Sequence, residues 1–205
     1  MKVLIINGSP HHEGTTFTAL KEMINIFESE GIEVDLFQLG AQNIRGCIDC
    51  GKCYQTVQCV FDDAVKDLSK RFQEADGLVV GSPVYYASAN GTLIALLDRL
   101  FHTARFNKTM KVGAAVCAAR RGGITTTFDE LNKYFTICGM PVASGQYWNG
   151  IHGSNGKEAY EDLEGLQQMR TLARNMVFLM RSIELGKEKY GLPFKEKGVA
   201  TNFIR

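Results

Sequence analysis

Residues 1–16 read MKVLIINGSPHHEGTT, and this stretch decides the fold. Residues 3–6 form a continuous apolar run, typical of a central parallel strand that is covered on both faces. The run passes directly into a loop rich in glycine and hydroxyl groups. Apolar residues at helical spacing follow the loop, namely Phe17, Leu20, Met23, Ile24 and Phe27. A buried strand, a polar loop and an amphipathic helix make the first unit of an α/β protein.

The same alternation repeats along the chain. Further strands are predicted over residues 33–37, 77–80, 112–117 and 140–144. Helical spacing recurs over residues 65–72, 93–101, 128–135 and 172–183. Five strand–helix units predict a doubly wound parallel sheet with helices on both faces. Ligands bind such sheets at the carboxyl ends of the strands, so the loops after the first, third and fourth strands form the candidate site.

Composition and charge are those of an ordinary globular chain. The 205 residues are 45% apolar and 22% charged, which fits a single domain with a full core. The formal net charge of +1 predicts no general attraction to nucleic acid or to an anionic membrane. No apolar run approaches the roughly 20 residues that cross a bilayer, and the first run is too short for a signal peptide. The sequence therefore predicts a cytoplasmic protein.

We expect one domain over residues 1–185 and a C-terminal tail over residues 186–205. The tail is polar with scattered apolar side chains, among them Tyr190, Leu192, Phe194 and Phe203. Tails of this composition are commonly disordered. Docking of its aromatic side chains onto a neighbouring subunit is the alternative.

The loop after the first strand has the residues of a phosphate site. Ser9, Thr15 and Thr16 supply hydroxyl groups, while Gly8 and Gly14 let the backbone approach a ligand closely. Hydroxyls and free N–H groups at a helix N-terminus favour an anion. The loop is neither a Walker loop nor a Gly-x-Gly-x-x-Gly turn. An ordinary capped connection between strand and helix is the alternative.

The other two loops carry aromatic and basic side chains. Tyr85 and Tyr86 follow the third strand, where they would either lie against a planar ring or plug the top of the core. Arg120 and Arg121 precede two glycines after the fourth strand. Guanidinium groups there would stabilise an anionic ring or bind a nucleotide phosphate, unless they form a solvated charged loop.

Four motifs in order make residues 1–145 resemble the NAD(P)H-dependent FMN reductase family of the flavodoxin-like superfamily. They are Gly8-Ser9-Pro10 with Gly14-Thr15-Thr16, Ala75-Asp76-Gly77, Ser82-Pro83-Val84-Tyr85 and Leu97-Asp98-Arg99. The resemblance implies a flavodoxin-like five-stranded sheet in the order 2-1-3-4-5. It also implies that the hydroxyls of the first loop hold the FMN phosphate and that the other two loops border the isoalloxazine. The implied flavin residues are Ser9, Pro10, His11, Gly14, Thr15, Thr16, Pro83, Val84, Tyr85, Tyr86, Ser88, Ala119, Arg120, Gly122 and Gly123.

One position departs from this pattern. Relatives often carry a basic residue after Ser-Pro, where this chain has His11. Because histidine titrates near neutrality, we expect phosphate affinity to be weaker or pH-dependent.

Four of the six cysteines fall within thirteen residues, at Cys47, Cys50, Cys53 and Cys59. Three cysteines that are each separated by two residues, with a fourth cysteine nearby, can together ligate one cubane cluster. Zinc, a regulatory disulfide and plain structural thiols are the alternatives. The spacing resembles that of the iron–sulfur flavoproteins, and this resemblance implies that the four cysteines ligate a [4Fe–4S] cluster. The remaining two, Cys117 and Cys138, are expected to be small buried hydrophobic residues.

Three functions follow from these patterns. The preferred one is an FMN-dependent oxidoreductase that passes electrons from NAD(P)H to a flavin, a quinone or a similar small molecule. The second is an iron–sulfur flavoprotein electron carrier that accepts electrons from ferredoxin. The third is a flavodoxin-like binding module without turnover. Since a flavin supplies its own redox chemistry, no catalytic side chain is predicted. The family resemblance also implies a homodimer or homotetramer.

Overall fold

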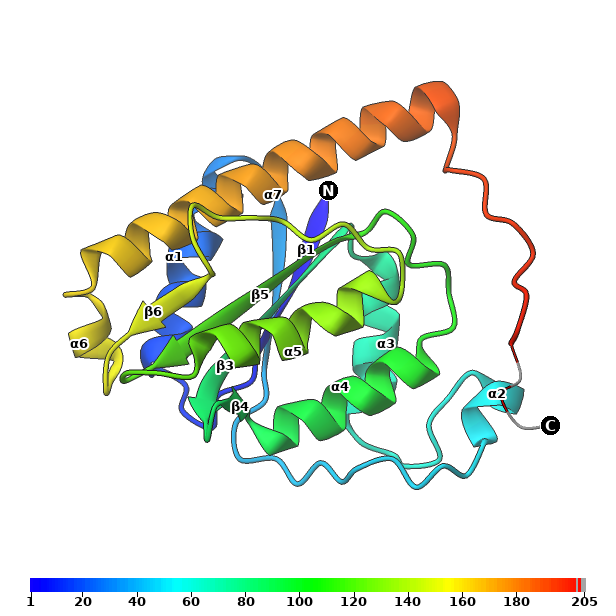
Figure 1. Cartoon of the computed structure of the whole chain (residues 1–205), viewed down its shortest axis with the longest axis horizontal. Helices are drawn as coiled ribbons and strands as arrows, with labels where there is room; N and C mark the ends of the chain where they lie inside the picture. The colour runs from blue at the N-terminus through cyan, green and yellow to red at the C-terminus, as the bar shows by residue number, and fades with distance from the viewer. Residues whose placement is uncertain (202, 204–205) are drawn as a thin grey trace.

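The computed structural model describes residues 1–201 and residue 203, and Figure 1 shows strands and helices alternating along the chain. The strands are β1 (Lys2–Asn7), β2 (Glu33–Gln38), β3 (Gly77–Tyr85), β4 (Ser88–Ala89), β5 (Val112–Ala119) and β6 (Gly150–His152). The helices are α1 (Thr15–Ser29), α2 (Lys52–Thr56), α3 (Ala64–Glu74), α4 (Gly91–Thr103), α5 (Ile124–Thr136), α6 (Gly156–Ala159) and α7 (Leu163–Tyr190).

The sheet has parallel strands in the order β2-β1-β3-β5-β6, and the two-residue β4 pairs antiparallel with β3. Since β5 and β6 are the fourth and fifth parallel strands, the predicted order 2-1-3-4-5 is confirmed. From β1 the chain adds β2 on one side of the sheet and β3, β5 and β6 on the other, so the direction of strand addition reverses between β1 and β3. The register of these two strands pairs Ile5 with Val79. Such a switch point is where open α/β sheets bind their ligands.

The fifth strand lies later in the chain than predicted. Residues 140–144 contribute a single parallel bridge between Gly113 and Val142. Regular pairing begins only at β6, where Gly150 lies opposite Cys117. Pro141 has no N–H to give to a ladder, so the apolar run 140–144 does not make a full strand. The fifth parallel strand therefore ends at His152, and the loop after it lies at the carboxyl edge of the sheet.

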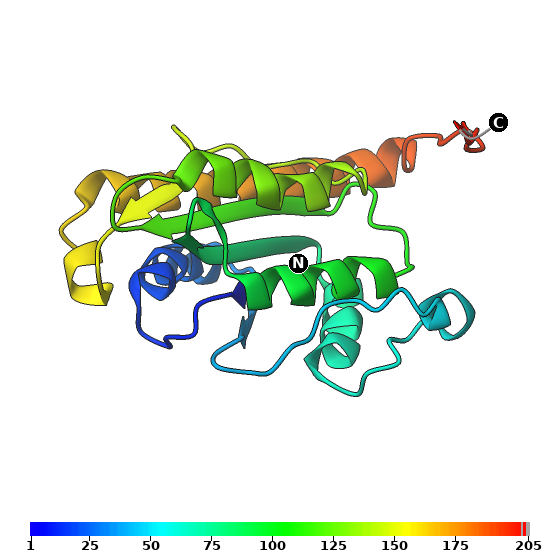
Figure 2. The same cartoon turned by 60° about the horizontal axis from the view of Figure 1, so that its bottom comes forward.

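Helices cover both faces of the sheet, as Figures 1 and 2 show. Val3 and Ile5 of β1 pack with α1 and α7, while Leu4 and Ile6 pack with α3, α4 and α5. All four side chains are buried, because alternate residues of a central strand point to opposite layers and both layers are apolar.

The last helix is longer than predicted. Helix α7 begins after Asp162, whose carboxylate accepts a hydrogen bond from the Gly165 N–H at 2.9 Å. It runs to Tyr190, past the predicted domain boundary at residue 185, because its charged last turns favour helix. Among the described helices, including this one of 28 residues, none is long and apolar enough to cross a membrane. Beyond α7, Phe194 is exposed, and docking of the tail onto a subunit stays a prediction.

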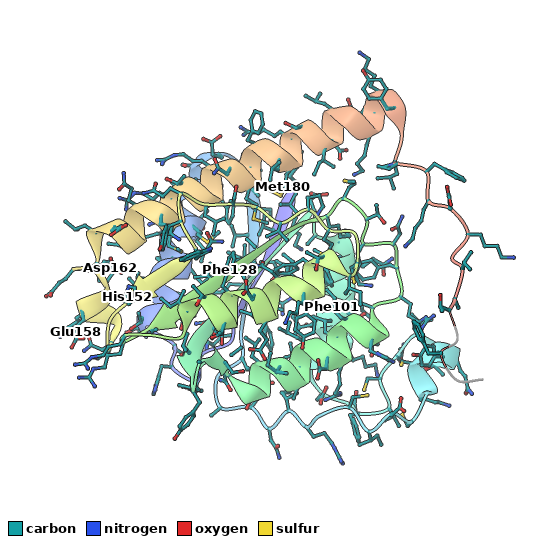
Figure 3. All side chains as sticks on the ribbon, viewed as in Figure 1. Phe101, Phe128, His152, Glu158, Asp162 and Met180 are labelled. Carbon is teal, nitrogen blue, oxygen red and sulfur yellow. The ribbon has the colours of Figure 1, made fainter. Side chains whose placement is uncertain are left out.

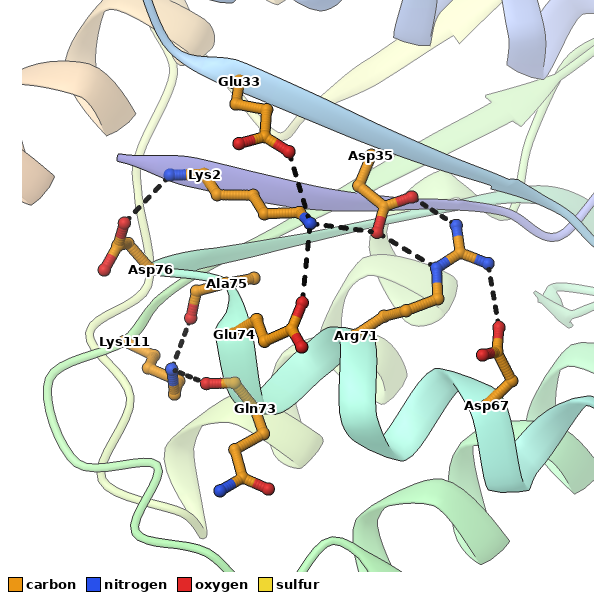
Figure 4. Close-up of polar contacts among 10 residues, drawn as sticks. All are labelled: Lys2, Glu33, Asp35, Asp67, Arg71, Gln73, Glu74, Ala75, Asp76 and Lys111. Atoms are coloured by element: carbon orange, nitrogen blue, oxygen red, sulfur yellow. Dashed lines mark hydrogen bonds and ion pairs between the residues drawn. The ribbon is translucent and has the colours of Figure 1, made fainter.

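Figure 4 shows a charged cluster where β1, β2 and α3 meet. Arg71 donates hydrogen bonds to both carboxylate oxygens of Asp35, one of them from Nε at 3.0 Å. Lys2 Nζ lies 3.7 Å from the same carboxylate. The hydrogen bonds from Arg71, together with the charge of both cations, lower the pKa of the Asp35 carboxyl.

We expect Asp35→Asn to lower the free energy of unfolding by about 1 kcal/mol at neutral pH. A carboxyl whose pKa is lowered by folding stabilises the protein above its unfolded pKa, near 4. It loses that contribution as the pH falls through the lower, folded pKa. The difference in free energy of unfolding between variant and wild type should therefore become smaller below about pH 4. Urea denaturation at several pH values measures it, with Asp67→Asn, an exposed Arg71 partner, as the control. A gap that does not change with pH contradicts the assignment.

Candidate functional site

A cleft of about 870 Å³ opens at the carboxyl ends of β1, β3 and β5. It brings together the three predicted loops, which lie far apart in the sequence, and a fourth loop after β6. The predicted flavin residues that line it are Ser9, Pro10, His11, Gly14, Thr15, Thr16, Pro83, Val84, Tyr85, Ala119 and Arg120. The other four, Tyr86, Ser88, Gly122 and Gly123, lie outside this lining.

One end of the cleft is the N-terminus of α1. Gly14 is the N-cap and no side chain caps this helix, so the backbone N–H groups of its first turn have no side-chain acceptor. Thr15 Oγ1 donates to the Gly153 carbonyl at 3.1 Å, and Thr16 is almost completely buried beneath the loop. Uncapped N–H groups, hydroxyls and the positive end of the helix dipole together suit an anion such as phosphate.

The loop before α1 is fixed by its backbone. The Gly8 N–H donates to the Gly81 carbonyl at 2.8 Å, and Asn90 Nδ2 donates to the Gly8 carbonyl at 2.8 Å. A Cβ at Gly8 would lie 2.8 Å from the Gly81 backbone oxygen as well as 2.4 Å from Leu93 Cδ2, so only glycine fits here. Gln38 Nε2 donates to the Ser9 carbonyl at 2.7 Å. These contacts hold the loop in place before any ligand arrives.

Residues 153–156, after β6, form a wall of the cleft that sequence reasoning missed. Thr18 Oγ1 donates to the Gly156 carbonyl at 3.3 Å, and a Cβ at Gly156 would lie 2.4 Å from the Glu13 carbonyl oxygen. The signal was the turn sequence Gly-Ser-Asn-Gly. The predicted site comprised only the loops after the first, third and fourth strands, whereas this loop follows the fifth. Three further lining residues are not among the implied flavin residues, namely His12, Glu13 and Ala118.

The hairpin between β3 and β4 places Tyr85 at the cleft and Tyr86 away from it. Tyr86 and Ala87 have φ values of 52° and 60°, so a two-residue turn joins the strands with both residues in the left-handed region. Tyr86 is therefore fully exposed at the tip. Ser88 Oγ donates to the Glu130 carboxylate at 2.9 Å, which turns it away from the cleft and ties the hairpin to α5.

Gly123 supports this hairpin from behind. Its φ is +95°, and a Cβ there would lie 2.8 Å from Val84 Cγ1 and 2.9 Å from Ala87 Cα. Glycine is therefore needed both for the backbone conformation and for the close approach of the two loops. Neighbouring Gly122 has open space around its Cα.

We expect Gly123→Ala to lower the melting temperature by about 5 °C, because a positive φ and the clash together cost about 2 kcal/mol. The adjacent Gly122→Ala has neither problem and serves as the matched control, with a change of at most about 1 °C. Thermal unfolding followed by circular dichroism measures both. Equal melting temperatures for the two variants would contradict the assigned role of Gly123.

The four clustered cysteines line one small pocket between residues 45–63 and α4; Figure 2 shows this segment running along the outside of the helix. They are free thiols. The Asp49 N–H donates to Cys47 Sγ at 3.4 Å. Across residues 1–201 and 203, however, no three metal-binding side chains lie close enough to hold a metal ion. The fold thus gathers the thiols on one pocket without placing them at ligand spacing.

Arg99 holds the cysteine segment onto α4, a role that the sequence did not reveal. Its side chain is 1% exposed and donates to Asp63 at 2.6 and 2.9 Å. It also donates to Cys59 Sγ at 3.1 and 3.3 Å and to the Arg45 carbonyl at 3.2 Å. Two signals were present, an arginine inside an apolar helical stripe and its place in the motif Leu97-Asp98-Arg99. Of the other cysteines, Cys117 is buried as predicted, and burial raises its pKa to about 12, while Cys138 is half-buried.

The sequence profile of the NADPH-dependent FMN reductases matches residues 1–154, which include three of the loops that line the cleft and half of the fourth, residues 153–156. The chain belongs to the NADPH-dependent FMN reductase family. Within it, an iron–sulfur flavoprotein of Methanocaldococcus jannaschii is 32% identical over 90% of this chain and 100% of its own length. An iron–sulfur flavoprotein of Methanosarcina thermophila is 28% identical over 92% of this chain and 100% of its own length.

Solved structures confirm the fold class of this FMN reductase family member. RosB, solved with bound 8-demethyl-8-formylriboflavin-5′-phosphate, superposes with a TM-score of 0.67 at 15% identity. The match covers 100% of this chain and 92% of RosB. A flavodoxin from the domain Archaea superposes with a TM-score of 0.54 at 18% identity, over 85% of this chain and 99% of the flavodoxin. The architecture is flavodoxin-like, as predicted.

Proposed function

We propose that FMN occupies the cleft and that this protein is an FMN-dependent oxidoreductase that transfers electrons from NAD(P)H to a flavin, quinone or similar acceptor. Family membership supports the FMN-dependent oxidoreductase class. The observation that carries the proposal is the uncapped α1 N-terminus at the end of a cleft at the sheet's switch point. Its volume lies in the range of pockets that bind molecules of this size.

The lining residues suit the two ends of FMN differently. Ser9, Thr15 and Thr16 would bind the phosphate together with the first N–H groups of α1. Pro83–Tyr85 would border one side of the isoalloxazine, and Arg120 would favour a negative charge on it. FMN supplies the redox chemistry when bound, so these residues bind, orient and tune it.

An anaerobic titration tests the electron donor. NADH and NADPH are added separately to the FMN-loaded protein while the flavin absorbance is followed, and menadione is then added. We expect one of the two nucleotides to bleach the flavin within seconds and menadione to restore its colour. Bleaching by dithionite but by neither nucleotide would rule out NAD(P)H as the donor.

A second function is favoured by the four thiols that share one pocket. Here the cysteines would ligate a [4Fe–4S] cluster, and the protein would carry electrons from ferredoxin to FMN. The donors fit in kind and number, and N–H groups already point at two of the sulfur atoms. Because no three ligands are at binding distance within the described residues, the segment would have to close around the cluster.

Iron and acid-labile sulfide in anaerobically purified protein test this function. We expect about four iron atoms per chain, lost in Cys50→Ser/Cys53→Ser and retained in the control Cys138→Ser. If the wild-type protein contains flavin but no iron, the [4Fe–4S] cluster is excluded and the NAD(P)H-dependent function remains.

A further inference from the structure

A second pocket, of about 370 Å³, lies across residues 119–123 from the flavin cleft. Arg121 and His152 line this pocket, whereas their chain neighbours Arg120 and Gly153 line the cleft. The two cavities therefore share a wall but no lining residue. Figure 3 shows His152 and Asp162 close together at the end of the molecule that β6 and α6 form.

Two aromatic side chains stand at the edge of this pocket. Tyr147 and Trp148 line it, with ring centroids 4.5 Å apart. Trp148 is the single tryptophan of the chain, and it is 49% exposed although large aromatic side chains are usually buried. An exposed aromatic pair beside a concave surface is a platform on which a planar ring can stack.

The floor of the pocket holds a polar side chain without a partner. Gln168 is 3% exposed and lines the pocket, and its Nε2 donates to no acceptor among the described residues. Asn149 is completely buried beside the pocket, and its Oδ1 accepts no hydrogen bond from that same set of residues. A Cβ at Gly145 would lie 2.7 Å from Asn149 Oδ1 and 3.4 Å from Gln168 Cγ, so the two side chains pack around the same glycine. Buried polar groups without partners are rare, which indicates that something outside the chain binds here.

Cationic and proton-bearing groups complete the lining. Asp162 Oδ2 accepts the His152 backbone N–H at 2.7 Å and lies 3.4 Å from His152 Nδ1, while Oδ1 accepts the Gly165 N–H. Both carboxylate oxygens of Asp162 thus already accept backbone N–H groups. Arg121 is exposed on the loop, and the carboxylate of Glu164 lies in an exposed position on α7. An anionic group would therefore bind next to Arg121, away from Glu164.

We propose that Arg121, Tyr147, Trp148, His152 and Gln168 form a binding site for a planar aromatic molecule that carries a ring carbonyl and an anionic group; we call it the aromatic pocket. The ring stacks on Trp148, the carbonyl accepts a hydrogen bond from Gln168 Nε2, and the anion pairs with Arg121. Its lining is separate from that of the flavin cleft, but it includes Gly122 and Gly123, which the family resemblance assigns to the flavin, so the test measures probe binding with and without FMN. The competing explanation is one water molecule that bridges Gln168 and Asn149.

Isothermal titration calorimetry with coumarin-3-carboxylate tests this site in the full chain, with and without FMN. This probe has a planar bicycle, a ring carbonyl and a carboxylate, whereas the control 2-naphthoate lacks the ring carbonyl. We expect both to bind and to quench Trp148 fluorescence. Gln168→Leu should weaken only the coumarin, by about tenfold, because it removes one hydrogen-bond donor. Arg121→Ala should weaken both probes by about fivefold, and Arg105→Ala, an exposed arginine elsewhere, should weaken neither.

Three results would overturn the proposal. One is the absence of binding by either probe to folded protein. Another is competition between the probe and FMN, which would place the probe in the flavin cleft. The third is unchanged coumarin affinity in Gln168→Leu, as a bridging water would give. If that variant does not fold, unchanged affinity in Arg121→Ala, a surface change, overturns the proposal equally. Failure of FMN to bind while the probe binds would count against the proposed function and leave the aromatic pocket intact.

Discussion

Replacing Ser9 and Thr16 together by alanine is expected to lower the affinity for FMN by about 100-fold, because each hydroxyl would donate a charge-assisted hydrogen bond to the phosphate. Both residues line the cleft at the N-terminus of α1. The backbone N–H groups of α1 remain in the variant, so binding is weakened and not abolished. Quenching of flavin fluorescence during titration with the protein measures the dissociation constant.

Two controls separate a lost hydroxyl from a disturbed fold. Ser29→Ala/Thr136→Ala removes two hydroxyls that donate only to carbonyls near helix ends, and its FMN affinity should equal that of the wild type. The single variant Thr16→Ser keeps the hydroxyl and loses only the buried methyl group. With Ser9 unchanged, it should bind FMN almost as tightly as the wild type. An affinity of the alanine double variant within about threefold of the wild type would place the phosphate elsewhere.

Arg99→Met is expected to lower the free energy of unfolding by about 3 kcal/mol, the second large effect. The substitution leaves Asp63 without its guanidinium partner, and breaking a buried ion pair from one side costs several kcal/mol. Asp63 is also the N-cap of α3, where its carboxylate accepts the Val65 N–H at 3.2 Å. Loss of Arg99 therefore loosens both the start of α3 and residues 45–63.

Urea denaturation measures this effect, and Arg181→Met is the matched control. Arg181 pairs with Glu30 at 2.9 Å, but both side chains are largely exposed, so we expect less than about 1 kcal/mol. Arg99→Lys should recover only part of the loss, since an ammonium group cannot hold Asp63, Cys59 and the Arg45 carbonyl together. Similar unfolding curves for the Arg99 and Arg181 methionine variants would show that Arg99 does not anchor the segment.

The fold and most of the flavin cleft were predictable from the sequence because their signals are local. A continuous apolar run such as residues 3–6 indicates a buried strand wherever the other strands lie. Parallel strands place their carboxyl ends at one edge, so the loops at residues 9–16, 83–85 and 119–120 had to meet. The compact cysteine motif likewise placed four thiols on one pocket.

Other features depended on contacts between residues far apart in the chain, and only the tertiary structure decided them. One of them is the segment that pairs with the end of β5: β6 pairs there, while residues 140–144 make a single bridge to Gly113. The wall at residues 153–156 is held by hydroxyls of α1, and Gly123 is required by the β3–β4 hairpin. The sequence shows that Arg99 and Gln168 are polar residues within predicted helices, but it does not show which groups they contact. Whether such a side chain anchors a distant segment or stays unpaired in a pocket is determined by the groups that folding packs around it.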